Sequence, residues 1–292
     1  MVTRSSQKSE VSSQEMRPPV PIRPPVNRAP TMAPPMRKQV MFGQVSTTAG
    51  HRIVLYGPGG IGKTCLAAQM PGPVAFVDLD ESLGKLKRYM DEREIRVTPV
   101  DGVNNWQDLR TALQSDGWDK IKSIVIDTGT KAEELAVAHT LGVVPHEKGQ
   151  KCNSIEDYGY GKGFGHVFDT FLPLLADLDR HCRAGRNVAI ICHDCTTTVP
   201  NPAGEDWLRY EPRLQSPGSG KASIRLRVRE WADHVLFMGY DLDVTKEGKG
   251  RGAGTKTIYT SELPHFMAKS RTCQQSIPVG NDGAAVWSEI IK

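Results

Sequence analysis

Apolar runs of strand length recur along the chain from about residue 50. They read RIVLY (52–56), PVAFVD (73–78), IKSIVID (121–127), NVAIIC (187–192) and HVLFM (234–238). Short runs without polar alternation are typical of strands that are buried on both faces. The pattern therefore predicts the central strands of a parallel sheet.

Helical periodicity fills intervals between these runs. One apolar stripe consists of Val103, Trp106, Leu109 and Leu113, and a longer one consists of Phe168, Phe171, Leu172, Leu175 and Leu178. The longer stripe stops before Gly185, which is typical of a helix end. Strands that alternate with helices predict βαβ units, so the expected fold class is α/β, with a mostly parallel sheet flanked by helices.

The first 45 residues have a different composition. Eight of the 20 prolines fall within residues 18–35, and a segment this rich in proline forms neither a helix nor a central strand. We expect residues 1–45 to be a disordered tail and residues 46–292 to be one folded domain. The tail is interpreted as a polyproline-II spacer or as a basic arm that contacts nucleic acid or a partner protein.

The formal net charge of +4 is unevenly distributed. Residues 1–40 carry seven basic and two acidic side chains, which leaves 30 bases and 31 acids in the rest of the chain. A polyanion bound by the folded domain must then be held by local patches, because no global field attracts it.

Hydropathy and cysteine usage indicate a soluble protein of the cytoplasm. No run approaches the roughly 18 apolar residues of a membrane helix, and the polar N-terminus lacks the apolar stretch of a signal peptide. The six cysteines are too thinly spread for a disulfide framework, so we expect reduced thiols and no membrane partner.

One motif carries specific chemistry. Residues Gly57, Pro58, Gly59, Gly60, Ile61, Gly62, Lys63 and Thr64 match G-x-x-x-x-G-K-[ST] at every fixed position, between an apolar strand and a predicted helix. In such a phosphate-binding loop the backbone N–H groups and the helix N-terminus cradle phosphate oxygens. Lys63 would reach the β- and γ-phosphates, the Thr64 hydroxyl would bind Mg²⁺, and Cys65 follows as a further nucleotide contact.

The same glycines also fit a dinucleotide fingerprint. Gly57, Gly59 and Gly62 have G-x-G-x-x-G spacing, and Asp78 ends the next strand, where a ribose-binding acid would lie. That fingerprint does not call for Lys63 and Thr64, whereas a phosphate-binding loop needs both. The P-loop interpretation is therefore favoured over an NAD-dependent oxidoreductase.

Carboxylates at strand ends supply candidates for the metal and the attacking water. Asp127 follows four apolar residues and is the expected Mg²⁺-associated carboxylate. Asp80 and Glu81, just beyond the preceding predicted strand, are both candidates to orient or deprotonate water, and Asp78 is interpreted as structural. His193 ends the fourth predicted strand, where a γ-phosphate sensor would lie. Because the guanine-reading motif Asn-Lys-x-Asp does not occur, ATP is favoured over GTP.

Taken together, these segments resemble a known family. The stretches RIVLYGPGGIGKTCLAAQ, VAFVDLDES, SIVIDT, YGYGKGFG through NVAIICHD, and REWADHVLFM are similar in order to the RecA-like P-loop ATPase domain common in bacteriophages. Some members of that family are single-strand-annealing recombinases related to RecA and RadA. The resemblance covers about residues 50–275 and implies a RecA-like ATPase domain that uses ATP and Mg²⁺.

The resemblance also implies roles for individual residues. It places the catalytic acid at Asp80, with Glu81 adjacent; the family's usual acid is a glutamate, so the choice between them stays open. It places the γ-phosphate sensor at His193. Lys269 and Arg271, in the stretch AKSR, resemble the pair that in RecA-type filaments reaches the ATP of the neighbouring subunit.

RecA-like proteins bind DNA through two loops, and the matching stretches here combine bases with aromatic rings. The basic candidates are Lys148, Lys151 and Lys162 in residues 146–163, and Arg209, Arg213 and Lys221 in residues 194–222. Bases hold phosphates while rings stack on nucleobases, which suits single strands. Arg225, Arg227 and Arg229 would share one face if that segment were a strand. The glycine-rich, basic residues 246–256 suit a flexible hairpin tip that touches DNA or is simply disordered.

These features predict an ATP-dependent, single-stranded-DNA-binding recombinase that promotes annealing or strand exchange in phage recombination. DNA would stimulate its ATPase activity in the host cytoplasm, and the resemblance implies a homo-oligomeric filament or ring. A single-strand-binding protein is a further expected partner. Two alternatives stay open: an ATPase of the same fold that acts on a protein partner in replication or packaging, and a nucleotide-gated binding module with little hydrolysis.

Overall fold

The computed structural model describes residues 42–43, 49–218, 220–244 and 250–292. The chain divides into two units, Met1–Val45 and Ser46–Lys292. Most of the predicted proline-rich tail, and residues 245–249 of the predicted hairpin tip, lie outside the described residues.

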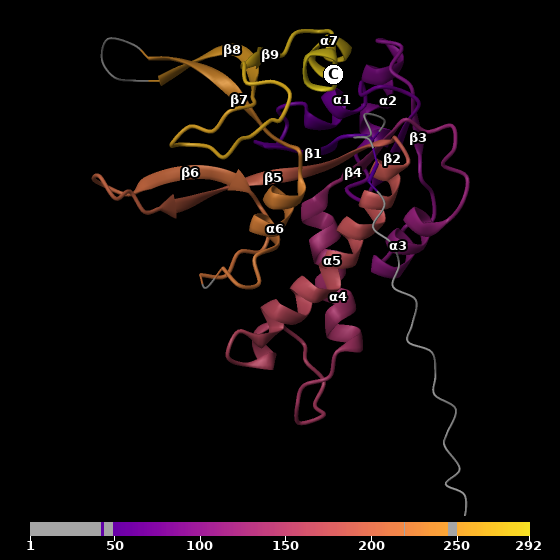
Figure 1. Cartoon of the computed structure of the whole chain (residues 1–292), viewed down its shortest axis with the longest axis vertical. Helices are drawn as coiled ribbons and strands as arrows, with labels where there is room; N and C mark the ends of the chain where they lie inside the picture. Colours follow the sequence, from indigo (N-terminus) through magenta and orange to yellow (C-terminus); the bar gives the residue numbers. More distant parts are fainter. Residues whose placement is uncertain (1–41, 44–48, 219, 245–249) are drawn as a thin grey trace, which may run out of the picture. The chain divides into compact units, whose positions relative to one another are not determined.

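A mixed sheet forms the centre of this unit (Figure 1). Its strands are β1 (Arg52–Gly57), β2 (Val74–Asp78), β3 (Val97–Pro99), β4 (Ser123–Asp127), β5 (Asn187–Val199), β6 (Trp207–Pro212), β7 (His234–Val244), β8 (Gly250–Tyr259) and β9 (Ile277–Pro278). The order is β3-β2-β4-β5-β1-β7-β8-β9, and β6 pairs with β5. Strands β3 to β7 along this order are parallel, whereas β6, β8 and β9 pair antiparallel. The predicted α/β class is confirmed.

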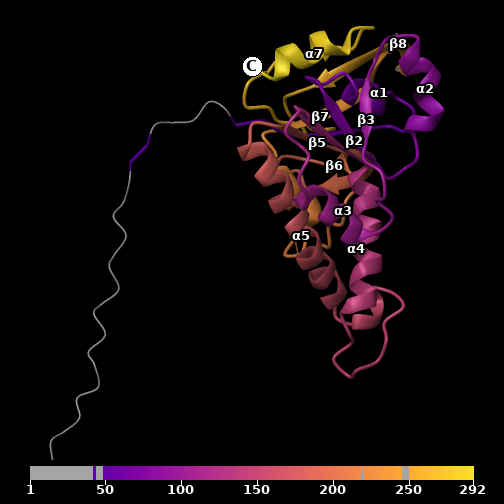
Figure 2. The same ribbon diagram turned by 90° about the vertical axis from the view of Figure 1, so that its right-hand side faces the viewer.

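Helices cover both faces of the sheet (Figure 2). They are α1 (Lys63–Ala67), α2 (Leu83–Asp91), α3 (Trp106–Gln114), α4 (Gly129–Val143), α5 (Lys162–Arg183), α6 (Ile224–Trp231) and α7 (Gly283–Ile290), with a 3-10 turn at Glu156–Tyr158. The longer stripe lies in α5, and Trp106, Leu109 and Leu113 of the shorter one lie in α3, whereas Val103 precedes that helix. Among the described residues, no helix is both long and apolar enough to span a membrane.

Side-chain alternation along the strands builds two apolar layers. Val54 and Tyr56 of β1 pack with α3, α4, α5 and α6, whereas Ile53 and Leu55 pack with α1, α2 and α7. Since successive strand residues point to opposite faces, a continuous apolar strand serves both layers. This explains why the central strands read as unbroken apolar runs.

The segment around Arg225 corrects a strand interpretation, because residues 224–231 form helix α6. Ser223 caps the helix, since its hydroxyl accepts a bond from Leu226 N at 3.1 Å. Ile224, Val228 and Trp231 are buried, at a spacing of four and then three residues. Alternation of arginines with apolar residues is typical of a strand. Here the conformation is instead determined by burial of Ile224, Val228 and Trp231 along one face of a helix.

Strand β5 continues beyond its apolar part into a hairpin. Its last residues are polar and pair with β6, from Asp194 opposite Pro212 to Val199 opposite Trp207. Figure 1 shows the β5–β6 hairpin extending from the sheet on the same side as β7 and β8. The predicted second DNA-binding loop is thus partly a regular hairpin.

Candidate nucleotide-binding site

The phosphate-binding loop connects β1 to α1. Gly57 has φ 153°, and a Cβ there would lie 2.2 Å from the Met238 carbonyl oxygen, so no other residue fits. Gly62, with φ 108°, precedes the first turn of α1. Side chains added at Gly59 or Gly60 would meet nothing within 4 Å. The loop is therefore tight where it leaves the sheet and open where phosphates would lie.

Lys63 lies inside this loop. Its Nζ donates to the carbonyl oxygens of Gly57 at 2.7 Å and Pro58 at 2.9 Å, and the residue is only 7% exposed. Burial lowers the pKa of Lys63 below its ordinary value, because the ammonium loses water; its two hydrogen-bond acceptors are neutral, and the charges of Asp194, Asp127 and Asp80 only partly oppose the fall. A phosphate group would supply the missing negative charge, so the loop fits a nucleotide.

Asp127 and Thr64 form the candidate metal pair. Thr64 Oγ1 donates to Asp127 Oδ2 at 2.7 Å, and Ser82 Oγ approaches the same oxygen at 3.3 Å. Burial raises the pKa of Asp127 to about 6, and the nearby charges of Asp78 and Asp80 add to the rise. A divalent cation would favour the ionised form, so this hydroxyl and carboxylate fit Mg²⁺, which prefers oxygen ligands.

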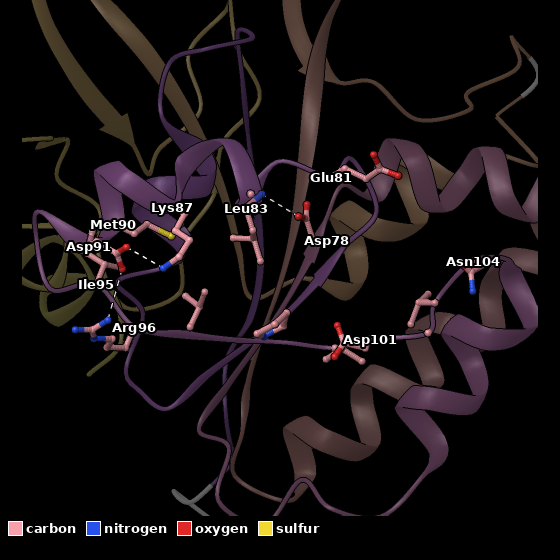
Figure 3. A pocket seen from close by; sticks show the side chains of 16 residues that line it. Asp78, Glu81, Leu83, Lys87, Met90, Asp91, Ile95, Arg96, Asp101 and Asn104 are labelled. Atoms are coloured by element: carbon pink, nitrogen blue, oxygen red, sulfur yellow. Dashed lines mark hydrogen bonds and ion pairs between the residues drawn. The ribbon is translucent and has the colours of Figure 1, made fainter.

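Asp78 has a structural role. Its carboxylate accepts a bond from Leu83 N at 2.8 Å (Figure 3). It also accepts one from Ser82 N at 2.9 Å. These N–H groups are at the start of α2 and have no partner within the helix. Asp78 therefore fixes the loop that carries the two candidate acids.

Those two acids line different hollows. Asp80 lines a hollow of about 260 Å³ together with residues of the loop, the metal pair and the fourth predicted strand end. Its lining is Gly59, Gly60, Gly62, Lys63, Thr64, Cys65, Asp80, Ser82, Leu86, Asp127, Thr128, Ile191 and His193. Glu81 is exposed, has φ 53°, and lines a separate cavity beside α2.

His193 approaches Asp80 from β5. The register pairs His193 with Gly57, and His193 Nε2 lies 3.6 Å from Asp80 Oδ2. The predicted sensor, candidate acid, P-loop lysine and Mg²⁺ carboxylate thus meet in one hollow. They meet because parallel strands bring their carboxyl ends to one edge of a sheet.

A second hollow of about 450 Å³ adjoins the loop and includes residues the sequence did not indicate. It is lined by Ile61, Cys65 and Tyr89, among others, and by Lys256 of β8. Lys256 Nζ donates to the carbonyl oxygen of Ile61 at 2.6 Å. In the sequence Lys256 is only part of a basic, glycine-rich stretch, and pairing of β8 with β7 brings it to the loop.

The cavity that Glu81 lines has a volume of about 660 Å³ and lies between α2, β3 and residues 99–104 (Figure 3). Its two bases, Lys87 and Arg96, both pair with Asp91, at 2.8 and 3.6 Å. The same cavity is lined by four carboxylates, those of Asp78, Glu81, Asp91 and Asp101, so acids outnumber the two bases and the cavity does not favour a phosphate.

Lys269 and Arg271 lie away from the loop of their own chain. The backbone of Lys269 pairs with Val235, and Arg271 Nε lies 3.0 Å from Asp233 Oδ1. Asp233 lies beside Arg52 and Val235 beside Val54, whereas the loop follows the other end of β1, about 17 Å and about 10 Å further along the strand, respectively. Within one chain these side chains do not join the nucleotide site.

The predicted DNA-binding residues fall into two separate regions. Lys148 and Lys151 are exposed in the connection between α4 and α5, and Lys162 is exposed at the start of α5, paired with Glu147. The others lie on β6 or shortly after it, or on α6. Figure 1 shows the α4–α5 connection away from the β5–β6 hairpin.

Two of the arginines are not available at the surface. Arg209 is 7% exposed and pairs with Glu262 and with Glu211, at 3.6 Å to the latter. Arg225 Nη1 lies 2.6 Å from Glu211 Oε2. Arg213 and Lys221 are exposed. We expected Arg209 and Arg225 to contact DNA, but both side chains pair with carboxylates of the same chain instead.

Comparison with protein families agrees with a P-loop domain. Residues 49–272 match a family model described as an AAA domain. Among solved structures, the flagellar accessory protein FlaH from Methanocaldococcus jannaschii aligns with a TM-score of 0.35 and 12% identity, covering 72% of this chain and 77% of that chain. No curated protein matches the chain.

Proposed function

We propose that this chain, which belongs to the AAA domain family of P-loop ATPases, hydrolyses ATP with the aid of Mg²⁺. One observation carries the proposal: a single hollow is lined by Lys63, Thr64, Asp127 and Asp80. These are the cation, metal ligands and carboxylate that phosphoryl transfer to water requires.

Each group has a distinct task in this reaction. Lys63 and the loop N–H groups bind the phosphates, and Thr64 and Asp127 hold Mg²⁺, which would neutralise charge on the transferred phosphoryl group. Asp80 orients or deprotonates the attacking water. His193, whose Nε2 lies 3.6 Å from Asp80 Oδ2, acts as the γ-phosphate sensor: it would contact the γ-phosphate when ATP is bound. The position of Glu81 in another cavity supports Asp80 as the acid.

Turnover of three variants tests these assignments. Lys63→Ala should abolish ATP hydrolysis, and Asp80→Asn should reduce kcat by about 10² or more, as expected for loss of a general base. Glu81→Gln is the matched control and should retain kcat within about two-fold, because it lines another cavity. Loss of turnover in Glu81→Gln with retention in Asp80→Asn would reverse the assignment.

The proposed partner is single-stranded DNA, annealed or exchanged by an oligomer of this chain. The support is the resemblance together with exposed bases and rings: Lys148, Lys151, Arg213, Lys221, Trp207 and Tyr210. The distance of Lys269 and Arg271 from their own loop is compatible with contact to a neighbouring copy's nucleotide. ATP turnover should rise with oligothymidylate, and binding should weaken between 50 and 200 mM salt.

A protein partner is the second candidate. The supporting observation is that Arg209 and Arg225 near the hairpin are paired with carboxylates, whereas Trp207 and Leu208 are 39% and 66% exposed. Exposed apolar side chains on a projecting strand suit a protein interface. Turnover that depends on Lys63 but neither binds nor responds to DNA would favour this candidate.

A further inference from the structure

One buried hydroxyl joins His193 to the segment that follows β6. Thr130 is the second residue of α4 and is 7% exposed. Its Oγ1 accepts a bond from His193 N at 3.3 Å and donates to the Arg213 carbonyl oxygen at 3.2 Å. Arg213 N in turn donates to the His193 carbonyl oxygen at 2.8 Å. The three residues form a closed set of hydrogen bonds.

The start of α4 is fixed tightly against the sheet. A Cβ at Gly129 would lie 2.3 Å from Ile190 Cγ2, so the glycine allows the helix to approach β5. Thr128 Oγ1 accepts a bond from Lys131 N at 3.1 Å and caps the first turn. Thr130 is therefore held by the backbone that directly follows Asp127, and its hydroxyl has a defined position.

The segment after β6 has a second attachment to the same helix. Gln215 N donates to Glu133 Oε2 at 2.7 Å, and Gln215 Nε2 donates to the carbonyl oxygens of Phe164 and Ala222 at 2.9 and 2.8 Å. Residues 213–215 are thus held by α4 on one side of the chain's nucleotide hollow, next to the strand end that carries His193.

We propose that Thr130 is a positioning residue for His193 in the hydrolysis proposed above, on which this inference rests. Thr130 does not line the nucleotide hollow, so its effect must pass through His193. Without the hydroxyl, His193 N and the Arg213 carbonyl lose their shared partner. The end of β5 is then held less firmly where the imidazole meets Asp80.

The test uses Thr130→Val, which keeps the shape of the side chain and removes the hydroxyl. We expect kcat for ATP to fall roughly ten-fold, as for loss of one to two ordinary hydrogen bonds, with KM unchanged within about two-fold. Thr130→Ser should restore kcat. The matched control is Thr140→Val on the same helix, where a buried hydroxyl donates to Ala136 O at 2.8 Å, away from the site. It should lower the melting temperature but leave kcat unchanged.

A double-mutant cycle separates positioning from general stability. In a His193→Ala background, Thr130→Val should cause no further loss of kcat, because Thr130 acts only through the imidazole that His193→Ala has already removed. Independent, multiplying losses would overturn the proposal, as would wild-type kcat in Thr130→Val. If Thr130→Val does not fold, Thr130→Ala is assayed against the same two criteria. Failure of the wild type to show Lys63-dependent turnover would instead refute the proposed function itself.

Discussion

The buried carboxyl of Glu133 should make the stability of this protein depend on pH. Burial raises the pKa of Glu133 from 4.5 to about 7, although a bond from Gln215 N and the charges of Arg225 and Arg213 oppose the rise. The folded state thus holds this proton more tightly than the unfolded state. The associated stabilisation is complete below pH 4.5 and is lost as the pH rises through 7.

The size of the effect follows from the two pKa values. The interval from 4.5 to about 7 corresponds to about 3 kcal/mol of unfolding free energy lost by pH 8, and to less than about 1 kcal/mol lost by pH 5. Glu133→Gln removes the charge but keeps an oxygen that can accept from Gln215 N. The variant should therefore be about 3 kcal/mol more stable than wild type at pH 8, and nearly equal to it at pH 5.

Urea unfolding at pH 5 and pH 8, without nucleotide, measures both values. Glu134→Gln is the matched control, because Glu134 is the next residue of the same helix, is exposed, and pairs only with Lys131 among the described residues. The change in unfolding free energy caused by Glu134→Gln should be nearly the same at pH 5 and pH 8. A gain in Glu133→Gln that is equal at both pH values, or a loss of stability at pH 8, would refute the reasoning.

Three further predictions follow from buried charges. Asp127→Asn should raise the stability of the nucleotide-free protein at pH 8 and abolish the rise in melting temperature caused by Mg²⁺ with ATP. Burial lowers the pKa of His234 to about 4, so this side chain contributes a loss of about 2 kcal/mol of stability between pH 7 and pH 5, opposite in sign to the contribution of Glu133, and His234→Asn should remove that loss. Arg209→Met removes the cation that Glu211 and Glu262 share, and because Arg225 and Arg229 still pair with these carboxylates it should cost about 1 to 2 kcal/mol in urea unfolding.

The parts of the site that the sequence predicted are those set by local backbone and by strand order. Lys63 and Thr64 are placed by the geometry of the glycine loop itself, and Asp127 by its position at the end of an apolar strand. Parallel strands then bring these ends together whatever the connecting segments contain. The sequence could not distinguish Asp80 from Glu81. The two side chains line different cavities, and Glu81 has a positive φ angle, which the sequence does not reveal.

Long-range pairing determined what the sequence did not reveal. Lys256 joins the loop only because β8 pairs with β7, and Arg209 is neutralised only because Glu262, 53 residues further along the chain, lies next to β6. A cluster of bases indicates a polyanion site only when no carboxylate is folded against it. A buried guanidinium is costly unless a carboxylate pairs with it, whether or not DNA is present. A buried arginine is therefore more readily explained by such a pair than by a DNA contact. Arg213 and Lys221 remain exposed, so a DNA contact of the hairpin region should depend on them more than on Arg209.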